Sequence, residues 1–255
     1  MENKDLKKLY DKSYKNGINE TFYSMTNHEE ILGFLNYHDW SDKDVLDIGC
    51  GEGEFLSMLK GVGINNAMGV DFSKESIKIC NERYNLKNCE FITCDYRDVK
   101  EKFDVVTMIG VLEHMDDPLK TLKYIKNNLL KDKNSVVITS SPSFLNPRGY
   151  VWMTLQLLFD IPMSLSDLHF LTPTSFEGFS KELDFTYEYK SCNQKEGVGN
   201  ILIRDFKKRL TNALRDKKMS GNVDKLLEWL HQTENYNVFN ENTGVNIIYK
   251  LKWEN

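Results

Sequence analysis

The rhythm of apolar and polar positions changes at Asp44. From there on, short apolar runs alternate with amphipathic segments of helical length, a pattern typical of a parallel sheet with crossover helices. The predicted strands are residues 45–48, 67–71, 90–94, 103–108, 135–139, 185–189 and 245–253. The pattern therefore predicts an α/β fold built on one sheet of seven strands.

Signals for helix starts lie between these strands. Ser73 is placed to cap a helix, and Asp117 followed by Pro118 supplies an N-cap and a first-turn proline for another. The predicted helices are residues 55–59, 74–84, 119–130 and 172–183, with two more amphipathic helices within 200–235. The first forty residues, rich in charge and aromatic rings, are also predicted to be helical.

The segment 150–163 is apolar on nearly every side but contains Asp160 and Pro162. It is shorter than the roughly 18 apolar residues that indicate a spanning helix. It also lacks the Lys/Arg face of a helix that lies on a membrane. We interpret it as a packed lid or a dimer surface, with membrane docking as the less favoured alternative.

Composition narrows the classes of partner. The 255 residues include 33 Lys+Arg and 38 Asp+Glu, a net charge of −5, which disfavours nucleic acid as a partner. Five cysteines without a Cys-x-x-Cys pair fit neither a disulfide framework nor a structural zinc site. With no secretory signal visible, we expect a soluble cytoplasmic protein, monomeric or homodimeric.

Candidate ligand-binding residues follow the first strand. Asp47 leads into a turn with glycine at alternate positions, Gly49, Gly51 and Gly53, around Cys50. Such a strand, turn and helix let a ligand approach bare backbone N–H groups. A dinucleotide fingerprint would require a glycine where Glu54 stands, so a cofactor whose amino-acid end carries an ammonium suits this turn better.

Further acidic residues end the next two strands. Asp71 lies twenty residues after Gly51, where a carboxylate can accept hydrogen bonds from ribose hydroxyls, and Phe72 beside it can pack on adenine. Asp95 and Tyr96 follow the third strand and are placed for the base. Each acid alone could simply cap a helix. Their shared position at the carboxyl ends of neighbouring strands indicates one ligand crevice.

In these motifs the chain resembles the class I S-adenosylmethionine-dependent methyltransferases. The resemblance is clear over residues 44–140 and rests on four motifs in order, Asp47-x-Gly-x-Gly-x-Gly, Gly69-Val-Asp-Phe, Cys94-Asp, and Phe103-Asp-Val-Val leading into Val111-Leu-Glu-His-Met-x-Asp-Pro. The last motif is similar to that of the small-molecule branch, which includes ubiquinone-pathway and sugar or natural-product enzymes.

The resemblance implies a Rossmann-like sheet of seven strands, the last antiparallel, with helices on both faces and helical lid insertions. It implies one domain over 1–255, with an N-terminal helical cap (1–43), a cofactor-binding core (44–140), a lid and helix (141–184) and the last two strands (185–255). The helices at 200–235 depart from the family, which usually has a short hairpin there. They would form a wall of the substrate site or an interface.

The same resemblance assigns a cofactor, S-adenosyl-L-methionine, which leaves as S-adenosyl-L-homocysteine. Gly49, Cys50, Gly51 and Gly53 would line its methionine part, and Asp47 would lie near its ammonium. Asp71 would bind the ribose and Phe72 would pack on the adenine. Asp95 and Tyr96 would also face the adenine. The backbone at Ile109 would meet the methionine end. Tyr14 would reach the carboxylate or simply pack.

This resemblance implies an enzyme that transfers a methyl group to a small-molecule acceptor. A hydroxyl is the favoured acceptor group, and an amine is the second choice. Loss of the acceptor proton favours a histidine. His114 after the fourth strand and His169 before a lid helix are the candidates, against simpler roles in capping and packing. An RNA methyltransferase and a non-catalytic cofactor-binding regulator are the alternatives.

The same part of the sequence contains side chains that can bind a metal ion. In some relatives a Glu-x-x-Glu-His run helps to hold a divalent ion, and Glu113, His114 and His169 are donors that could converge. Gly110 stands at the first glutamate position, so charge and a ligand are both lost. The sequence therefore predicts no tightly bound metal.

Overall fold

The structure is a computed structural model that describes residues 28–161, 167–193, 199–214, 220–233 and 242–253. Seven strands form one sheet in the order β3-β2-β1-β4-β5-β7-β6. The strands are β1 (Asp44–Ile48), β2 (Asn66–Asp71), β3 (Cys89–Thr93), β4 (Val105–Ile109), β5 (Val136–Pro142), β6 (Phe185–Cys192) and β7 (Asn246–Trp253). Strand β7 pairs antiparallel with β5 and β6, while β1 to β5 run parallel, which confirms the predicted sheet.

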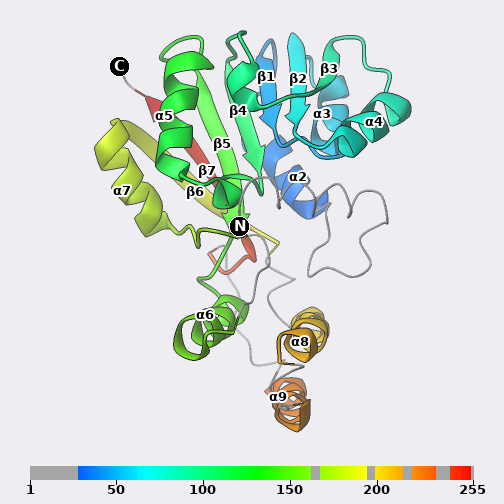
Figure 1. Cartoon of the computed structure of the whole chain (residues 1–255), viewed down its shortest axis with the longest axis vertical. Coiled ribbons are helices and arrows are strands. Elements are labelled where there is room, and N and C mark those ends of the chain that lie inside the picture. The colour runs from blue at the N-terminus through cyan, green and yellow to red at the C-terminus, as the bar shows by residue number, and fades with distance from the viewer. Residues whose placement is uncertain (1–27, 162–166, 194–198, 215–219, 234–241, 254–255) are drawn as a thin grey trace.

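Helices cover both faces of this sheet (Figure 1). They are α2 (His28–Leu35), α3 (Glu54–Met58), α4 (Lys74–Arg83), α5 (Pro118–Asn128) and α7 (Pro173–Leu183), with 3-10 turns η1 (Leu59–Gly61), η2 (Tyr96–Asp98) and η3 (Leu112–His114). Because strand side chains alternate between faces, Leu46 packs into the core under α5 and α7, whereas Val45 packs into the core under α2, α3 and α4.

The predicted start signals act as expected. The Ser73 side chain accepts the Ser76 amide at 3.3 Å at the start of α4, and Asp117 accepts the Lys120 amide at 3.0 Å at the start of α5. Helix α7 rests on the sheet through Phe176, whose ring stacks on Tyr249 of β7 with centroids 3.7 Å apart. The predicted helix 55–59 is displaced by one residue: α3 spans Glu54–Met58, and the chain tightens into η1 from Leu59.

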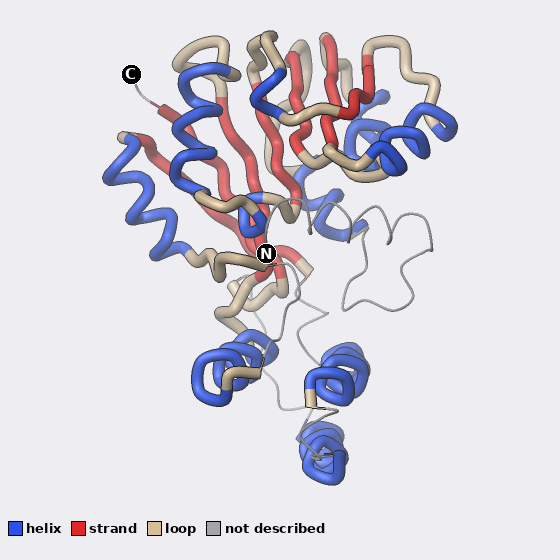
Figure 2. Tube along the Cα trace, in the orientation of Figure 1, coloured by secondary structure: helices blue, strands red, loops and turns tan. Residues whose placement is uncertain are grey.

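Three further helices form a separate group: α6 (Pro147–Phe159), α8 (Gly199–Ala213) and α9 (Ser220–Thr233). Figure 2 shows this group away from the sheet, on the side where β5 ends and leads into α6. Its apolar side chains make a third core, distinct from the two on the sheet faces. Among the residues that the structure describes, no helix has the length and apolar character needed to cross a bilayer.

Trp152 fastens α6 to α8. The guanidinium groups of Arg148 and Arg209 both lie over its ring, at 4.5 and 4.6 Å from the ring centroid. Asp205 of α8 pairs with both, at 3.1 Å to Arg148 Nε and 2.5 Å to Arg209 Nε. The carboxylate pairs with two cations that both lie over a buried ring, so these four side chains hold each other in place.

We expect Trp152→Ala to lower the free energy of unfolding by about 3–5 kcal/mol, because the change leaves a cavity and two partly buried guanidinium groups without their stacking partner. Urea unfolding would measure it. Tyr150→Ala is the matched control, since Tyr150 is on the same helix but 62% exposed, and should cost less than about 0.5 kcal/mol. Equal losses in the two variants would contradict the stacking role.

Candidate functional site

The glycine turn after β1 bends sharply, and its amides form hydrogen bonds within the turn and with β2. Gly49 and Gly53 have φ of +73° and +77°, and a Cβ on Gly49 would lie 2.6 Å from a Val111 methyl. Only glycine suits such a left-handed, crowded position. The Gly49 and Cys50 amides both donate to Val70 O, at 2.7 and 3.1 Å.

These bonds correct one expectation. The sequence suggested that the turn offers bare N–H groups to a ligand, but the amides of Gly49, Cys50, Gly51 and Gly53 all donate within the protein. The positive φ values curl the turn back on the end of β2, and this curvature directs those amides inward. What the turn presents to a ligand is a backbone surface without side chains.

Asp71 ties the ends of β1 and β2 together. Its Oδ2 accepts the Gly51 amide at 3.1 Å, and its Oδ1 accepts the Ser73 amide at 2.8 Å. The side chain is buried, at 7% exposure. An ionised carboxylate only accepts hydrogen bonds, so the two amides fix the orientation of Asp71.

Asp47 is a buried carboxylate at the same edge of the sheet, 2% exposed. Thr107 of β4 donates to its Oδ1 at 2.7 Å. Burial raises the pKa of Asp47 to about 7, the negative charge of Asp71 adds to this effect, and the hydrogen bond from Thr107 opposes it. Asp47 is therefore poised to ionise when a cation comes close.

The residues predicted to meet the base lie one strand further on. Asp95 accepts the Arg97 side chain through both oxygens and caps η2 through the Arg97 amide at 2.9 Å. The Arg97 hydrogen bonds lower the pKa of Asp95. Tyr96 packs edge-on against Tyr124 of α5, with ring centroids 5.6 Å apart. Capping and packing thus account for the observed contacts of both residues, and their adenine contacts stay predictions.

The other predicted cofactor residues are at the expected strand ends, with one exception. Phe72 directly follows β2, and Ile109 ends β4. Gly110 comes next, and its amide donates to Ser140 Oγ of β5 at 3.1 Å. Cys50 is buried, with its thiol against Gly69. Tyr14 lies outside the described residues.

On the acceptor side, η3 and the loop before α7 bring three ionisable side chains together: Glu113, His114 and Asp167. His114 Nδ1 is 3.4 Å from Asp167 Oδ1. Glu113 is 2% exposed. Burial raises the pKa of Glu113 well above its usual range, and the Asp167 carboxylate adds to the effect.

Sequence reasoning missed Asp167. Fifty-three residues separate it from His114, and no spacing rule connects an acid in a lid loop with a motif after the fourth strand. The available signal was its position two residues before His169, which the sequence did single out. The fold brings the two segments together, because the amides of Leu168 and His169 both donate to Glu113 O, at 2.9 and 3.1 Å.

His169 holds this loop in place. Its Nε2 lies 2.9 Å from Met115 O and 3.3 Å from Asp116 O. Because carbonyl oxygens only accept, Nε2 is the protonated nitrogen. The contact favours the packing role that the sequence left open, and a catalytic role for His169 stays a prediction.

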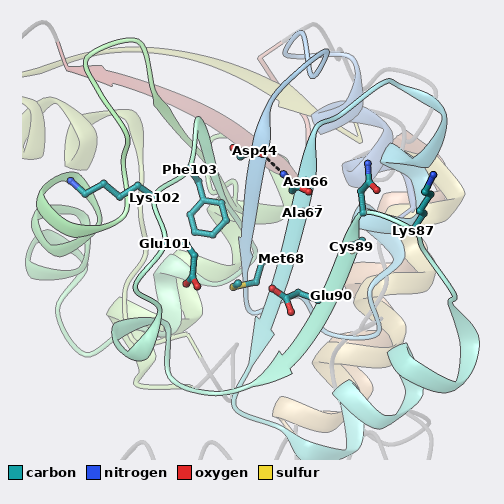
Figure 3. Close-up of a pocket in the computed structure, with 11 residues that line it drawn as sticks. Asp44, Asn66, Ala67, Met68, Lys87, Cys89, Glu90, Glu101, Lys102 and Phe103 are labelled. Carbon is teal, nitrogen blue, oxygen red and sulfur yellow. Dashed lines mark hydrogen bonds between the residues drawn. The ribbon is translucent and has the colours of Figure 1, made fainter.

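A pocket of about 450 Å³ lies elsewhere on the molecule (Figure 3). Asp44, Asn66 and Cys89, the first residues of β1, β2 and β3, line it, and Asn66 donates to Asp44 Oδ1 at 3.0 Å. These are the amino ends of the strands. Ligands of open α/β sheets bind outside the carboxyl ends, so this pocket is separate from the candidate site.

Comparison with curated proteins identifies relatives over part of the chain. It is 34% identical over 139 residues to an uncharacterised protein of Methanocaldococcus jannaschii, covering 52% of this chain and 48% of that one. It is 31% identical over 103 residues to the ubiquinone biosynthesis O-methyltransferase of Actinobacillus pleuropneumoniae, covering 35% and 42%. A tRNA U34 carboxymethyltransferase of Alteromonas mediterranea is 32% identical over 107 residues, covering 38% and 32%. The chain spans less than half the length of each.

Solved structures share the fold over nearly the whole chain. A complex of the Trm112 methyltransferase activator of Haloferax volcanii with a proposed methyltransferase superposes with a TM-score of 0.62 at 14% identity, covering 96% of this chain and 98% of the other. The DhpI-SAM-HEP complex gives 0.57 at 14% identity, covering 97% and 94%.

The match to a family is more specific than the shared fold. The family model described as "Methyltransferase domain" matches residues 23–189, more than half of the chain, and its range includes the glycine turn, Asp71 and the η3 cluster. The sheet order with antiparallel β7 and the acids at the carboxyl ends of its strands agree with that match. The chain belongs to the class I S-adenosylmethionine-dependent methyltransferases.

Proposed function

We propose that this protein transfers the methyl group of S-adenosylmethionine to an oxygen of a small-molecule acceptor, with nitrogen as the next candidate. The observation that carries the proposal is the half-buried His114 beside Asp167, just beyond the end of β4. A hydroxyl acceptor must lose its proton on methylation, and a histidine-carboxylate pair beside the crevice can assist that loss.

The cofactor half of the proposal rests on Asp47 and Asp71. Both are buried acids at the carboxyl ends of neighbouring strands β1 and β2. Asp71 is held by two amides in one orientation, and this suits the recognition of two adjacent ribose hydroxyls. Methyl transfer from a sulfonium has a good leaving group, so alignment and exclusion of water supply much of the rate.

The acceptor class is supported by charge and by a relative. A net charge of −5 gives little general attraction to a phosphate polymer. One relative is a ubiquinone biosynthesis O-methyltransferase, which acts on a small molecule by its name. A tRNA-modifying relative and the exposed Arg204, Lys207 and Lys208 on α8 favour RNA as the second candidate.

We expect Asp71→Asn to weaken S-adenosylmethionine binding by about 10- to 100-fold, since hydrogen bonds to a charged acceptor contribute about 1.5–3 kcal/mol. Calorimetric titration measures the affinity, and urea unfolding checks that the Gly51 turn survives. Asp98→Asn, at an exposed aspartate of η2, is the control and should bind normally. Unchanged affinity in Asp71→Asn would rule out the assigned ribose contact.

We expect the ionisation of Asp47 to make cofactor affinity rise with pH up to about 7 and then level off. The cofactor ammonium favours ionised Asp47, so binding releases the Asp47 proton, and below pH 7 the affinity falls by up to about tenfold per pH unit. Without cofactor, the raised pKa of Asp47 makes the folded protein less stable as pH rises from about 4 to 7. Titrations at several pH values compare wild type with Asp47→Asn. An identical pH dependence in both would contradict the pairing.

The acceptor class is tested with a labelled methyl donor offered to a small-metabolite extract and, separately, to total tRNA. We expect label in a small molecule, and His114→Ala should lower that turnover at least about tenfold while sparing cofactor affinity. His231→Ala on α9 is the matched control. Label in tRNA would replace the proposal with the RNA candidate. Cofactor binding with no transfer to either pool would indicate a non-catalytic binding protein.

A further inference from the structure

The three side chains of the η3 cluster, Glu113, His114 and Asp167, are donors of the kind that bind divalent ions. One donor atom from each lies within 4.8 Å of the other two. Glu113 and His114 come from the turn after β4, and Asp167 comes from the loop before α7. Two carboxylates and one imidazole form a mixed oxygen and nitrogen set, which suits Zn²⁺ and similar transition ions better than Ca²⁺ or Mg²⁺.

Backbone contacts fix the two segments relative to each other. The Leu168 and His169 amides donate to Glu113 O, and His169 Nε2 donates to Met115 O. In the loop these bonds involve the two residues that follow Asp167. At η3 they involve Glu113 and the residue that follows His114. The donor set is therefore built into the docking of the loop on η3, and does not depend on long surface side chains.

The spacing of His114 and Asp167 fits ligands of one ion. Their nearest atoms, Nδ1 and Oδ1, are 3.4 Å apart. A strong charge-assisted hydrogen bond between such groups is shorter, about 2.7–2.9 Å. Two ligands that each lie about 2.1 Å from a tetrahedrally coordinated ion are about 3.4 Å from each other.

Glu113 gives an independent indication. Its Oε2 is buried and makes no hydrogen bond within the described structure, although the residue is only 2% exposed. A buried carboxylate is costly unless it is paired or coordinates a metal, and here a second carboxylate, Asp167, lies close by. A divalent cation would supply the missing partner of Oε2 and remove the repulsion between the two acids.

We propose that Glu113, His114 and Asp167 bind one divalent ion of the Zn²⁺ type. The sequence predicted no tightly bound metal because Gly110 stands where relatives have a carboxylate. Asp167 supplies a carboxylate from a different segment, so the charge that seemed lost is restored. Three protein ligands leave a fourth position open, as in catalytic zinc sites.

The open position gives the ion a role that rests on the proposed function. The cluster adjoins the predicted cofactor site, since Glu113 Oε1 lies 3.8 Å from where a Cβ on Gly110 would be, one residue after Ile109. An acceptor hydroxyl bound there would have its pKa lowered towards neutrality. The proton would then pass to solvent water, and His114 would assist its loss as a metal ligand, without taking the proton itself.

The test titrates chelator-treated, full-length protein with Zn²⁺ by calorimetry, without cofactor or acceptor. Because the five cysteines can also bind Zn²⁺, the readout is the binding event that Glu113→Gln and Asp167→Asn remove or weaken. We expect at least about a tenfold loss in each, the low end of what even an outer-shell partner contributes. Asp117→Asn, which keeps the α5 cap, should bind as wild type.

Thermal unfolding separates binding from folding. Zn²⁺ should raise the unfolding midpoint of wild type and of Asp117→Asn, but not of Glu113→Gln or Asp167→Asn. Without metal, Glu113→Gln should be at least as stable as wild type, because it removes one of two neighbouring acids and leaves the His114–Asp167 pair intact. Equal zinc affinity in all four proteins, or no binding in wild type, would overturn the site.

Failure of the site and failure of the proposed function are distinguishable. Zinc binding that depends on Glu113 and Asp167, with no methyl transfer, upholds the site and contradicts the function. Methyl transfer to a small molecule at an unchanged rate after chelation, with no zinc bound, upholds the function and contradicts the site.

Discussion

The Asp71 carboxylate is the contact on which the cofactor half of the molecule depends. It accepts the Gly51 amide from the turn after β1 and the Ser73 amide from the turn after β2. One side chain thereby sets the path of two loops at the same edge of the sheet. This arrangement requires glycine at positions 49 and 53. Both residues have positive φ, and a Cβ on either would clash with a neighbouring side chain.

A second constraint organises the acceptor side. The loop before α7 docks on η3 through two amides that share Glu113 O, and through His169. This docking places a buried acid pair beside His114, close to the end of β4. The energetic cost of two buried carboxylates is a feature of a functional position, because packing alone would favour apolar side chains there.

The helices α6, α8 and α9 add a core that the sheet does not need. Trp152, Arg148, Arg209 and Asp205 join α6 to α8, α9 packs on α8, and the group lies on the side where β5 ends. Variable elements at that end of an α/β fold commonly carry substrate specificity. This group is therefore where the chain differs most from a minimal cofactor-binding sheet.

The sequence by itself determined the sheet, its helices and the strand ends that carry the acids, because strand and helix periodicities and caps such as Ser73 and Asp117 are local signals. Only the tertiary structure decided what the acids contact. Asp95 accepts hydrogen bonds from the Arg97 side chain, and the amides of the glycine turn donate to other groups of the protein. Asp167, from a loop far away in the chain, lies beside Glu113 and His114. Local patterns specify an element and its face, whereas such contacts depend on how loops far apart in the chain pack together.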